Sequence, residues 1–298
     1  MAQFRSWNKR AHLKLIVFGS NGQLAQCIIA NENIAKIFSE INCVSWRQFL
    51  DGYVPRVCSK TVVIDTFANT DVDYAETFPA NVIKSHLISH MRLLEISKKA
   101  YRYIYISSTG VYGDSTFEPH AENDRVAPST VHHMSKYLAE KQAINEFSER
   151  SLILRIGWLF STLKLKKNFV SARLSDIVSA KRSNSILNVF QNQIGNPTFG
   201  PDLVDTICEL IEHDFSGLLN VANPSPVSRA EFIMEIANLI NAADVINFLP
   251  LSERPQRLAN VADNEMADTT LLRAILGREL PHWNIGLRHS IRSIYGKK

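Results

Sequence analysis

The stretch Lys14-Leu-Ile-Val-Phe-Gly-Ser-Asn-Gly-Gln-Leu-Ala25 decides the fold. Its apolar run, 15–18, is continuously hydrophobic, as a strand buried in a parallel sheet is. Gly19, Gly22 and Ala25 have the Gly-x-x-Gly-x-x-Ala spacing of a dinucleotide-binding turn, where small residues allow a tight turn and close approach of backbone N–H groups to a pyrophosphate. The pyrophosphate would lie at the positive end of the following helix. Taken alone, the motif fits a plain strand–helix connection equally well.

Composition places the chain among ordinary globular proteins. It has 298 residues, 45% of them hydrophobic and 21% charged, which allows one large domain or two. The net charge of +4 is small and the basic residues are dispersed, so no nucleic-acid partner is expected. The four cysteines have no metal-ligand spacing and favour a reducing, cytoplasmic location. No apolar run approaches the ~20 residues that a membrane span needs, and residues 1–10 lack a signal-peptide pattern, so we expect neither metal nor membrane contact.

Apolar runs alternate with helical patterns through the first half of the chain. We expect strands at 41–45, 61–65, 103–106 and 151–156, and helices at 79–99 and 134–147. Strands separated by helices form βαβ units with right-handed crossovers. The pattern therefore predicts an α/β fold with a doubly wound, Rossmann-like parallel sheet.

The pattern becomes less regular after residue 158. It predicts helices at 169–177, 203–211, 229–241 and 269–276, strands at 187–190, 217–222 and 247–251, and a turn at 193–198. The remainder of the tail, from residue 254 on, is expected to be rich in loops. We place a dinucleotide-binding domain at 1–160 and a smaller α/β substrate lobe at 161–298, with one strand near 218–221 returning to the main sheet.

Ligands of open parallel sheets bind at the carboxyl ends of the strands. The second strand is followed by Arg47 and by no acid that would hold the ribose of NAD. Arg47 would meet the 2′-phosphate of NADP or would be a surface residue, and we favour NADP over NAD. The third strand continues into Thr66, Phe67 and Ala68, where Phe67 would crowd a dinucleotide or point into the core.

Hydroxyl and basic side chains follow later. Ser107, Ser108 and Thr109 end the fourth strand and would hydrogen-bond a substrate carbonyl or form a turn. His132, Lys136 and Glu140 are four residues apart and so share one helix face. Alone, such a row is more often a solvated stripe than a site.

The order of these motifs resembles the extended short-chain dehydrogenase/reductase superfamily. The matching segments are Gly19-x-x-Gly-Gln-Leu24, Asn69-Thr-x-Val-Asp73, Ser107-Ser-x-x-Val-Tyr-Gly113 and the helix that carries Lys136. Segments 154–160, 168–169, 192–198, 254–255 and 280–287 resemble the dTDP-4-dehydrorhamnose reductase branch, which also contains the regulatory subunit of methionine adenosyltransferase.

The resemblance implies hydride transfer from a nicotinamide cofactor to a nucleotide-linked 4-keto-6-deoxysugar. It implies that Ser108 binds the carbonyl oxygen and that Lys136 holds the cofactor ribose, while His132 occupies the position of the family's proton-donating tyrosine. The cofactor contacts it implies are Gly19, Ser20, Asn21, Gly22, Gln23, Leu24, Arg47, Thr66, Phe67, Ala68 and Lys136. The positions near the family's sugar-nucleotide pocket are Trp158, Asn168 and Arg254.

The exchange of tyrosine for His132 leaves two functions open. An imidazole is shorter than a phenol and titrates near neutral pH, and a nearby ammonium depresses its pKa further. One hypothesis is a reductase of polysaccharide precursor synthesis in which His132 or a relayed water gives the proton. The other is a catalytically impaired, NAD(P)-binding regulatory or binding subunit. An epimerase or dehydratase on this scaffold would lack an evident acid pair. The expected partner is a nucleotide sugar, and a homodimer is compatible with the sequence.

Overall fold

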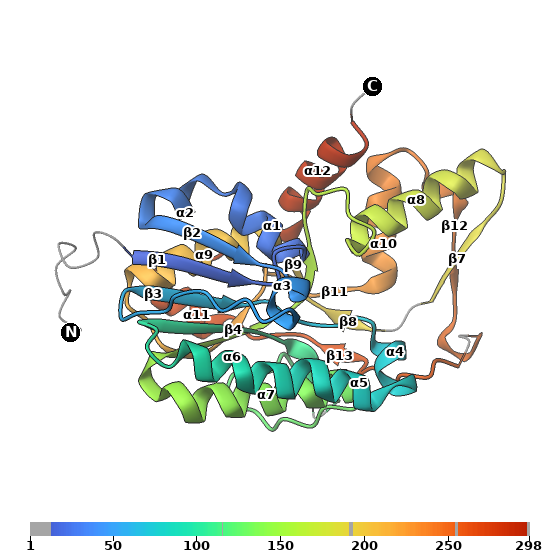
Figure 1. Ribbon diagram of the computed structural model, residues 1–298. Helices are drawn as coiled ribbons and strands as arrows, with labels where there is room; N and C mark the ends of the chain where they lie inside the picture. The colour runs from blue at the N-terminus through green and yellow to red at the C-terminus, as the bar shows by residue number, and fades with distance from the viewer. Residues whose placement is uncertain (1–12, 115, 191–192, 254–255, 297–298) are drawn as a thin grey trace.

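The computed structural model describes residues 13–114, 116–190, 193–253 and 256–296. Its centre is a six-stranded sheet in the order β10-β5-β4-β3-β1-β2, with every neighbouring pair parallel (Figure 1). The strands are β1 (Leu13–Phe18), β2 (Phe38–Val44), β3 (Thr61–Asp65), β4 (Arg102–Ser108), β5 (Ser151–Ile156) and β10 (Gly217–Val221). The order reverses at β1, as it does in a doubly wound fold, so the predicted fold class is confirmed.

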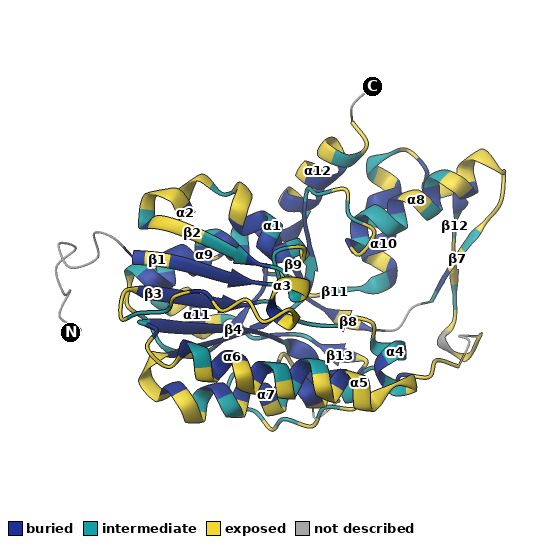
Figure 2. Ribbon diagram, in the orientation of Figure 1, coloured by how far each residue is buried: buried dark blue, intermediate teal, exposed yellow. Residues whose placement is uncertain are grey.

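Helices cover both faces of the sheet, so its inner strands are largely buried, and β3 and β5 are buried at every position (Figure 2). One face packs against α1 (Gln23–Ala30), α2 (Glu32–Ile37), α9 (Gly200–Glu212) and α11 (Thr270–Leu276). The other packs against α3 (Trp46–Leu50), α6 (Ser89–Ser97) and α7 (Val131–Phe147). The shorter elements α4 (Val72–Thr77), α5 (Pro79–Ile83) and the π-helical turn η2 (Lys84–Ile88) lead into α6. Every side chain of β3 and β5 is therefore shielded from water.

A second hydrophobic core lies in the later part of the chain. It is formed by α8 (Phe169–Arg182), α10 (Arg229–Leu239), α12 (Trp283–Ile294) and the paired strands β7 (Leu187–Phe190) and β12 (Ile246–Leu249). The connecting segments are β6 (Trp158–Phe160), β8 (Ile194–Gly195), β9 (Pro197–Phe199), β11 (Val227–Ser228) and β13 (Asn264–Glu265). Single helical turns complete the described chain: η3 (Thr109–Val111), η4 (Ser148–Arg150), η5 (Ala243–Val245) and η6 (Leu251–Glu253). Strand β10 follows α9 and pairs with β5, so the chain re-enters the main sheet between segments of this second core.

Two sequence predictions about the second half were wrong. The segment 193–198 is not a turn alone, because β8 and most of β9 lie in it and pair with β11, β13 and β6. The tail also holds a second long helix, α12, which buries Trp283, Leu287 and Ile291 at four-residue spacing. His282 caps this helix by accepting the N–H of Asn284 at 3.2 Å. The apolar stripe of α12 is masked in the sequence by the histidines and arginines between its members.

None of the helices in the described ranges has the length and apolar character that crossing a membrane requires.

Candidate cofactor and catalytic site

The turn between β1 and α1 needs glycine at its first position. Gly19 has a φ of +102°, and a Cβ there would lie 2.3 Å from Oγ1 of Thr66. That hydroxyl donates to the carbonyl of Phe18 at 2.7 Å, and the N–H of Gly22 closes the turn on Gly19 at 2.7 Å. The turn therefore packs against the end of β3, with Ser20 half-buried and Asn21 exposed.

Orphaned polar atoms occur at this turn, at the end of β4 and at the head of α7. Among the described residues, the buried side-chain atoms that lack a hydrogen-bond partner include Gln23 Nε2, Thr109 Oγ1 and His132 Nδ1. A buried polar group without a partner is costly, so a polar ligand that supplies partners is favoured there. Helix α1 also starts at Gln23 with no side-chain cap on its first N–H groups, while Leu24 is buried in the core. These features fit the pyrophosphate and ribose groups of a dinucleotide.

Phe67 points into an aromatic cluster and does not cross the turn. Its ring centroid lies 4.8 Å from that of Trp46, 5.4 Å from that of Phe49 and 5.8 Å from that of Phe18. Phe67 thus packs over the carboxyl ends of β1 to β3, while the following Ala68 is half-buried. Arg47 lies on α3 with 92% of its side chain exposed, 3.9 Å from Asp51. Its role toward a 2′-phosphate stays a prediction.

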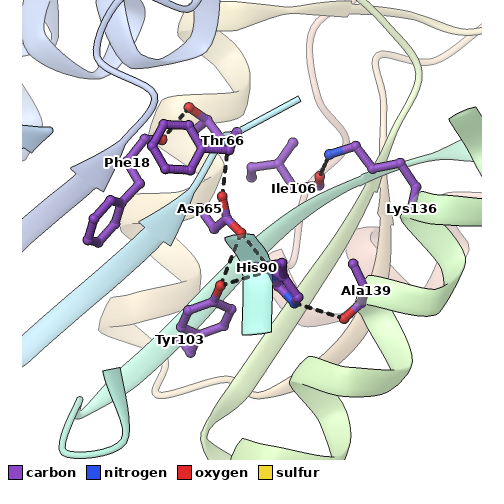
Figure 3. A network of polar contacts seen from close by, with 9 residues as sticks. Phe18, Asp65, Thr66, His90, Tyr103, Ile106, Lys136 and Ala139 are labelled. Atoms are coloured by element: carbon purple, nitrogen blue, oxygen red, sulfur yellow. Dashed lines mark hydrogen bonds and ion pairs between the residues drawn. The ribbon is translucent and has the colours of Figure 1, made fainter. Parts of the chain in front are cut away.

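Lys136 is a buried cation on α7. Its Nζ donates to the carbonyl of Ile106 at 2.8 Å (Figure 3). It also lies 4.8 Å from the ring centroid of Tyr105. Burial lowers its pKa to about 8, although the carboxylates of Asp65 and Glu140 oppose that shift. An ammonium with this pKa is charged at neutral pH and releases its proton readily in mildly alkaline solution.

The hydroxyl of Ser108 can donate a hydrogen bond to a ligand. It ends β4, is half-buried, and its Oγ accepts the N–H of Gly110 at 3.2 Å. The hydroxyl of the neighbouring Ser107 instead donates to the carboxylate of Glu140. Glu140 also forms a buried ion pair with Arg155 at 2.8 Å. Of the serine pair, only Ser108 suits the role of binding a carbonyl oxygen.

His132, at the first turn of α7, is neutral at neutral pH. It is 6% exposed, and its ring centroid lies 5.0 Å from that of His133 and 5.5 Å from that of His86. Burial, together with the neighbouring His133, Lys136 and His86, holds its pKa well below the usual range. At neutral pH, His132 is therefore not an imidazolium that could donate its extra proton.

His86 has a fixed tautomer. Its Nε2 accepts the N–H of Asn69 at 2.7 Å. Ser135 Oγ donates to the carbonyl of His132, so the contact of 2.8 Å between Ser135 Oγ and Nδ1 of His86 assigns the ring proton to Nδ1. Burial lowers the pKa of His86 to about 3. The network therefore holds the loop after β3 against the head of α7 with neutral groups.

Trp158 lies in a cluster that joins the sheet to the second core. Its Nε1 donates to Glu265 at 2.6 Å, and the guanidinium of Arg229 lies 3.6 Å from the indole centroid and 4.8 Å from the ring of Phe169. Burial lowers the pKa of Arg229 to about 10. Glu265 acts electrostatically on His133, which places the cluster close to the head of α7.

Asn168, the other predicted substrate residue in the described chain, does not join this cluster. Asn168 is fully buried and caps α8, and its Nδ2 donates to the carbonyls of Ser161 and Leu163 at 2.8 Å each. Both amide hydrogens of Asn168 are thus bonded to the loop before α8 and are not free to bind a substrate. Arg254 lies outside the described residues.

Sequence reasoning missed several residues of the site. They are Asp65, Asn69, His86, His90, Arg229 and Glu265. His86 and His90 are four apart in the helical pattern at 79–99, so they were recognisable as a polar pair on an apolar helix. Arg229 and Glu265 gave no such signal, because only the tertiary fold brings them to Trp158.

A protein-family model described as "RmlD substrate binding domain" matches residues 13–295. The chain belongs to this family. Its place in the extended short-chain dehydrogenase/reductases, in the branch that contains the dTDP-4-dehydrorhamnose reductases, is thereby confirmed. The chain is accordingly an NAD(P)-dependent oxidoreductase by class.

Curated relatives of this RmlD family match over nearly the whole chain. The spore coat polysaccharide biosynthesis protein SpsK of Bacillus subtilis is 28% identical over 297 residues, which cover 94% of this chain and 97% of SpsK. A dTDP-4-dehydrorhamnose reductase of Aggregatibacter actinomycetemcomitans is 23% identical, with 93% and 97% covered. The chain therefore spans nearly the full length of these relatives.

Solved structures of the family share the fold. The dTDP-4-dehydrorhamnose reductase of Yersinia enterocolitica superposes with a TM-score of 0.81 at 20% identity, covering 95% of this chain and 99% of that one. The reductase of Bacillus anthracis, solved in complex with NADP, gives a TM-score of 0.79 at 23% identity, with 94% and 99% covered. The shared fold extends across both hydrophobic cores.

Proposed function

We propose that this protein reduces the keto group of a nucleotide-linked 4-keto-6-deoxysugar with NADPH, in the synthesis of polysaccharide precursors. The observation that carries the proposal is the pairing of a buried ammonium, Lys136, with an available hydroxyl proton on Ser108, beside a glycine turn that fits a dinucleotide. A relative in spore coat polysaccharide synthesis and a sugar-nucleotide reductase support the same chemistry.

The binding roles follow from charge and hydrogen-bonding capacity. The uncapped backbone N–H groups at the start of α1, which follow the turn at Gly19 and Gly22, receive the pyrophosphate, and the ammonium of Lys136 holds the ribose hydroxyls. Bound NADPH supplies the hydride. Ser108 donates a hydrogen bond to the keto oxygen and stabilises the negative charge that develops when the hydride reaches the carbon.

The proton reaches the new alkoxide by a route that differs from direct donation by a phenol. His132 is neutral and therefore does not hold the proton as an imidazolium. Its ring, or a water beside it, instead relays a proton to the alkoxide. Lys136, with a pKa of about 8, is the nearby acid that can return a proton to the relay group after that group has given up its own. Hydride on carbon and proton on oxygen together give the hydroxyl of the product.

We place the nucleotide sugar between the dinucleotide-binding domain, 1–160, and the lobe at 161–298. Trp158 is buried near the head of α7, and the half-buried guanidinium of Arg229 stacks on its indole ring. A guanidinium recognises the oxygens of a diphosphate, and the indole on which it stacks holds it in position. Arg229 is thus added to Trp158 as a substrate residue.

The test is the oxidation of NADPH, followed by absorbance, with dTDP- and GDP-linked 4-keto-6-deoxysugars. The wild-type protein should turn over at least one of them, and Lys136→Ala should lose about 100-fold or more. Lys141→Ala is the matched control, because Lys141 lies on the same helix but is exposed, and it should keep the wild-type rate. Cofactor binding without turnover of any such sugar would contradict the reductase and indicate a binding subunit.

A further inference from the structure

A buried ion pair lies beneath the proposed cofactor site. Asp65, the last residue of β3, accepts from Nδ1 of His90 on α6 at 2.9 Å (Figure 3). The two side chains are 2% and 3% exposed. Asp65 also accepts from the hydroxyl of Tyr103 at 3.0 Å and from the N–H of Phe67 at 2.9 Å. The carboxylate is thus fully enclosed by donors.

Both ring nitrogens of His90 face acceptors. Nδ1 faces the carboxylate, and Nε2 lies 3.1 Å from the carbonyl oxygen of Ala139 on α7. A neutral ring would turn a lone pair toward one of these oxygens, so the geometry assigns a proton to each nitrogen and a positive charge to the ring. Burial alone would raise the pKa of Asp65, but the hydrogen bond and charge of His90 lower it overall.

The pair connects the two sides of the proposed dinucleotide site. On one side, Asp65 directly precedes Thr66, whose hydroxyl lies against Gly19. On the other, Ala139 is one helical turn beyond Lys136. The ring of Tyr105 completes the connection, since its centroid lies 5.0 Å from that of His90 and 4.8 Å from Nζ of Lys136.

We propose that Asp65 and His90 form a positioning pair, which holds α7 in register with the glycine turn and so places Lys136 for the cofactor ribose. This inference rests on the proposed function. A buried ion pair contributes little net stability, because the cost of desolvation offsets the attraction, and apolar side chains would hold α6 to the sheet as well. Its directional bonds to β3, β4 and α7 fix an orientation, which apolar packing does less well.

The charges of the pair also influence the pKa of Lys136. Asp65→Asn removes a negative charge near the ammonium, which lowers the pKa of Lys136. His90→Gln leaves the Asp65 carboxylate uncompensated, which raises the pKa of Lys136. The other titratable or charged groups that act on Lys136 from the packed elements are Glu140 with its partner Arg155, the phenol of Tyr105, and the imidazoles of His86, His132 and His133. All of these stay in place in both variants, so the two shifts must be opposite in sign.

The first test is the dissociation constant for NADPH, measured by calorimetry on the full chain. Asp65→Asn and His90→Gln should each weaken binding by about tenfold, and the double variant should be no weaker than the weaker single one, since both act through one pair. The double variant also removes both charges, so it remains measurable if a single variant fails to fold.

Arg102→Gln is the control. Arg102 is buried and pairs with Asp214 at 2.7 Å. It begins β4, at the end of the strand opposite to Ser108. Arg102→Gln should lower the melting temperature and leave the dissociation constant unchanged. If the Asp65 and His90 variants behave in the same way, with lower melting temperatures and unchanged NADPH affinity, the pair is structural only and the positioning role is wrong.

The second test is the pH at which NADPH affinity declines. That pH should move down in Asp65→Asn and up in His90→Gln, and a purely structural pair would move neither. If the variants bind NADPH as the wild type does, the positioning inference fails while the reductase proposal stands. Wild-type protein that binds neither NADPH nor NADH would overturn both.

Discussion

The glycine turn and the head of α7 lie on opposite sides of the proposed cofactor site and differ in what specifies them. The turn is specified by its backbone, because Gly19 combines a positive φ with a contact to Thr66 that leaves no room for a Cβ. The head of α7 is specified by side chains, His132 and Lys136, whose charges depend on burial and on neighbours from β3 and η2. The glycine spacing of the turn matches the motif that the sequence predicts, whereas we propose that the proton chemistry beside it relies on histidine.

The largest expected effect is on the turn. Gly19→Val forces a β-branched side chain into a left-handed backbone and onto Oγ1 of Thr66, 2.3 Å from the position of the new Cβ. We expect NADPH affinity to fall by about 100-fold in calorimetry, because misplacement of the turn disturbs the contacts with the pyrophosphate. Gly52→Val is the control, since Gly52 also has positive φ but has nothing within 4 Å, and it should bind normally. Equal losses in both variants would mean that backbone strain, and not the Thr66 contact, is responsible.

The next effect is on the head of α7. His132→Ala removes the proposed relay and should lower the rate of NADPH oxidation by about 10- to 100-fold with little change in NADPH affinity. His132→Tyr restores the family residue next to Lys136, and a gain in rate would show that the native site is impaired and not rewired. A rate in His132→Ala equal to that of the wild type would exclude a catalytic role for this ring.

A smaller effect is expected from pH. Lys136 has its pKa lowered to about 8, so the ammonium that holds the ribose is lost as the pH rises through that value. NADPH affinity should therefore fall by several-fold between about pH 7 and pH 9.5. Lys136→Met should bind weakly at both pH values and show no such decline. A decline that persists in Lys136→Met would assign it to another group.

The smallest effect is expected at Arg47. Its side chain is 92% exposed, so any contact with a 2′-phosphate is screened by solvent. Arg47→Ala should reduce the preference for NADPH over NADH by only a few-fold, measured as the ratio of kcat/KM values. An unchanged ratio would make Arg47 an ordinary surface residue and remove the reason for favouring NADP.

The parallel sheet, the glycine turn and the placement of Ser108 and Lys136 could be predicted from the sequence, because buried parallel strands and small-residue turns leave local patterns. The environment of His132 could not, since His86 comes from η2 and the neutral state of both rings depends on burial that no spacing records. The Asp65–His90 pair joins residues 25 apart in sequence and reaches Ala139 on a third element. Trp158 was found by resemblance, while Arg229 and Glu265 became visible only in the fold.

The protonation state of His132 is the most direct test of the contrast between the two sides of the site. Nitrogen NMR of the imidazoles, with His132→Gln used to assign the signal, distinguishes a neutral ring from an imidazolium. Since burial and nearby basic groups hold the pKa of His132 well below its usual range, its ring should be neutral at pH 7 and should not titrate between pH 6 and 7. A ring that is charged at pH 7, or that titrates between pH 6 and 7 as an exposed histidine does, would contradict the account and make His132 a direct acid in place of the family tyrosine.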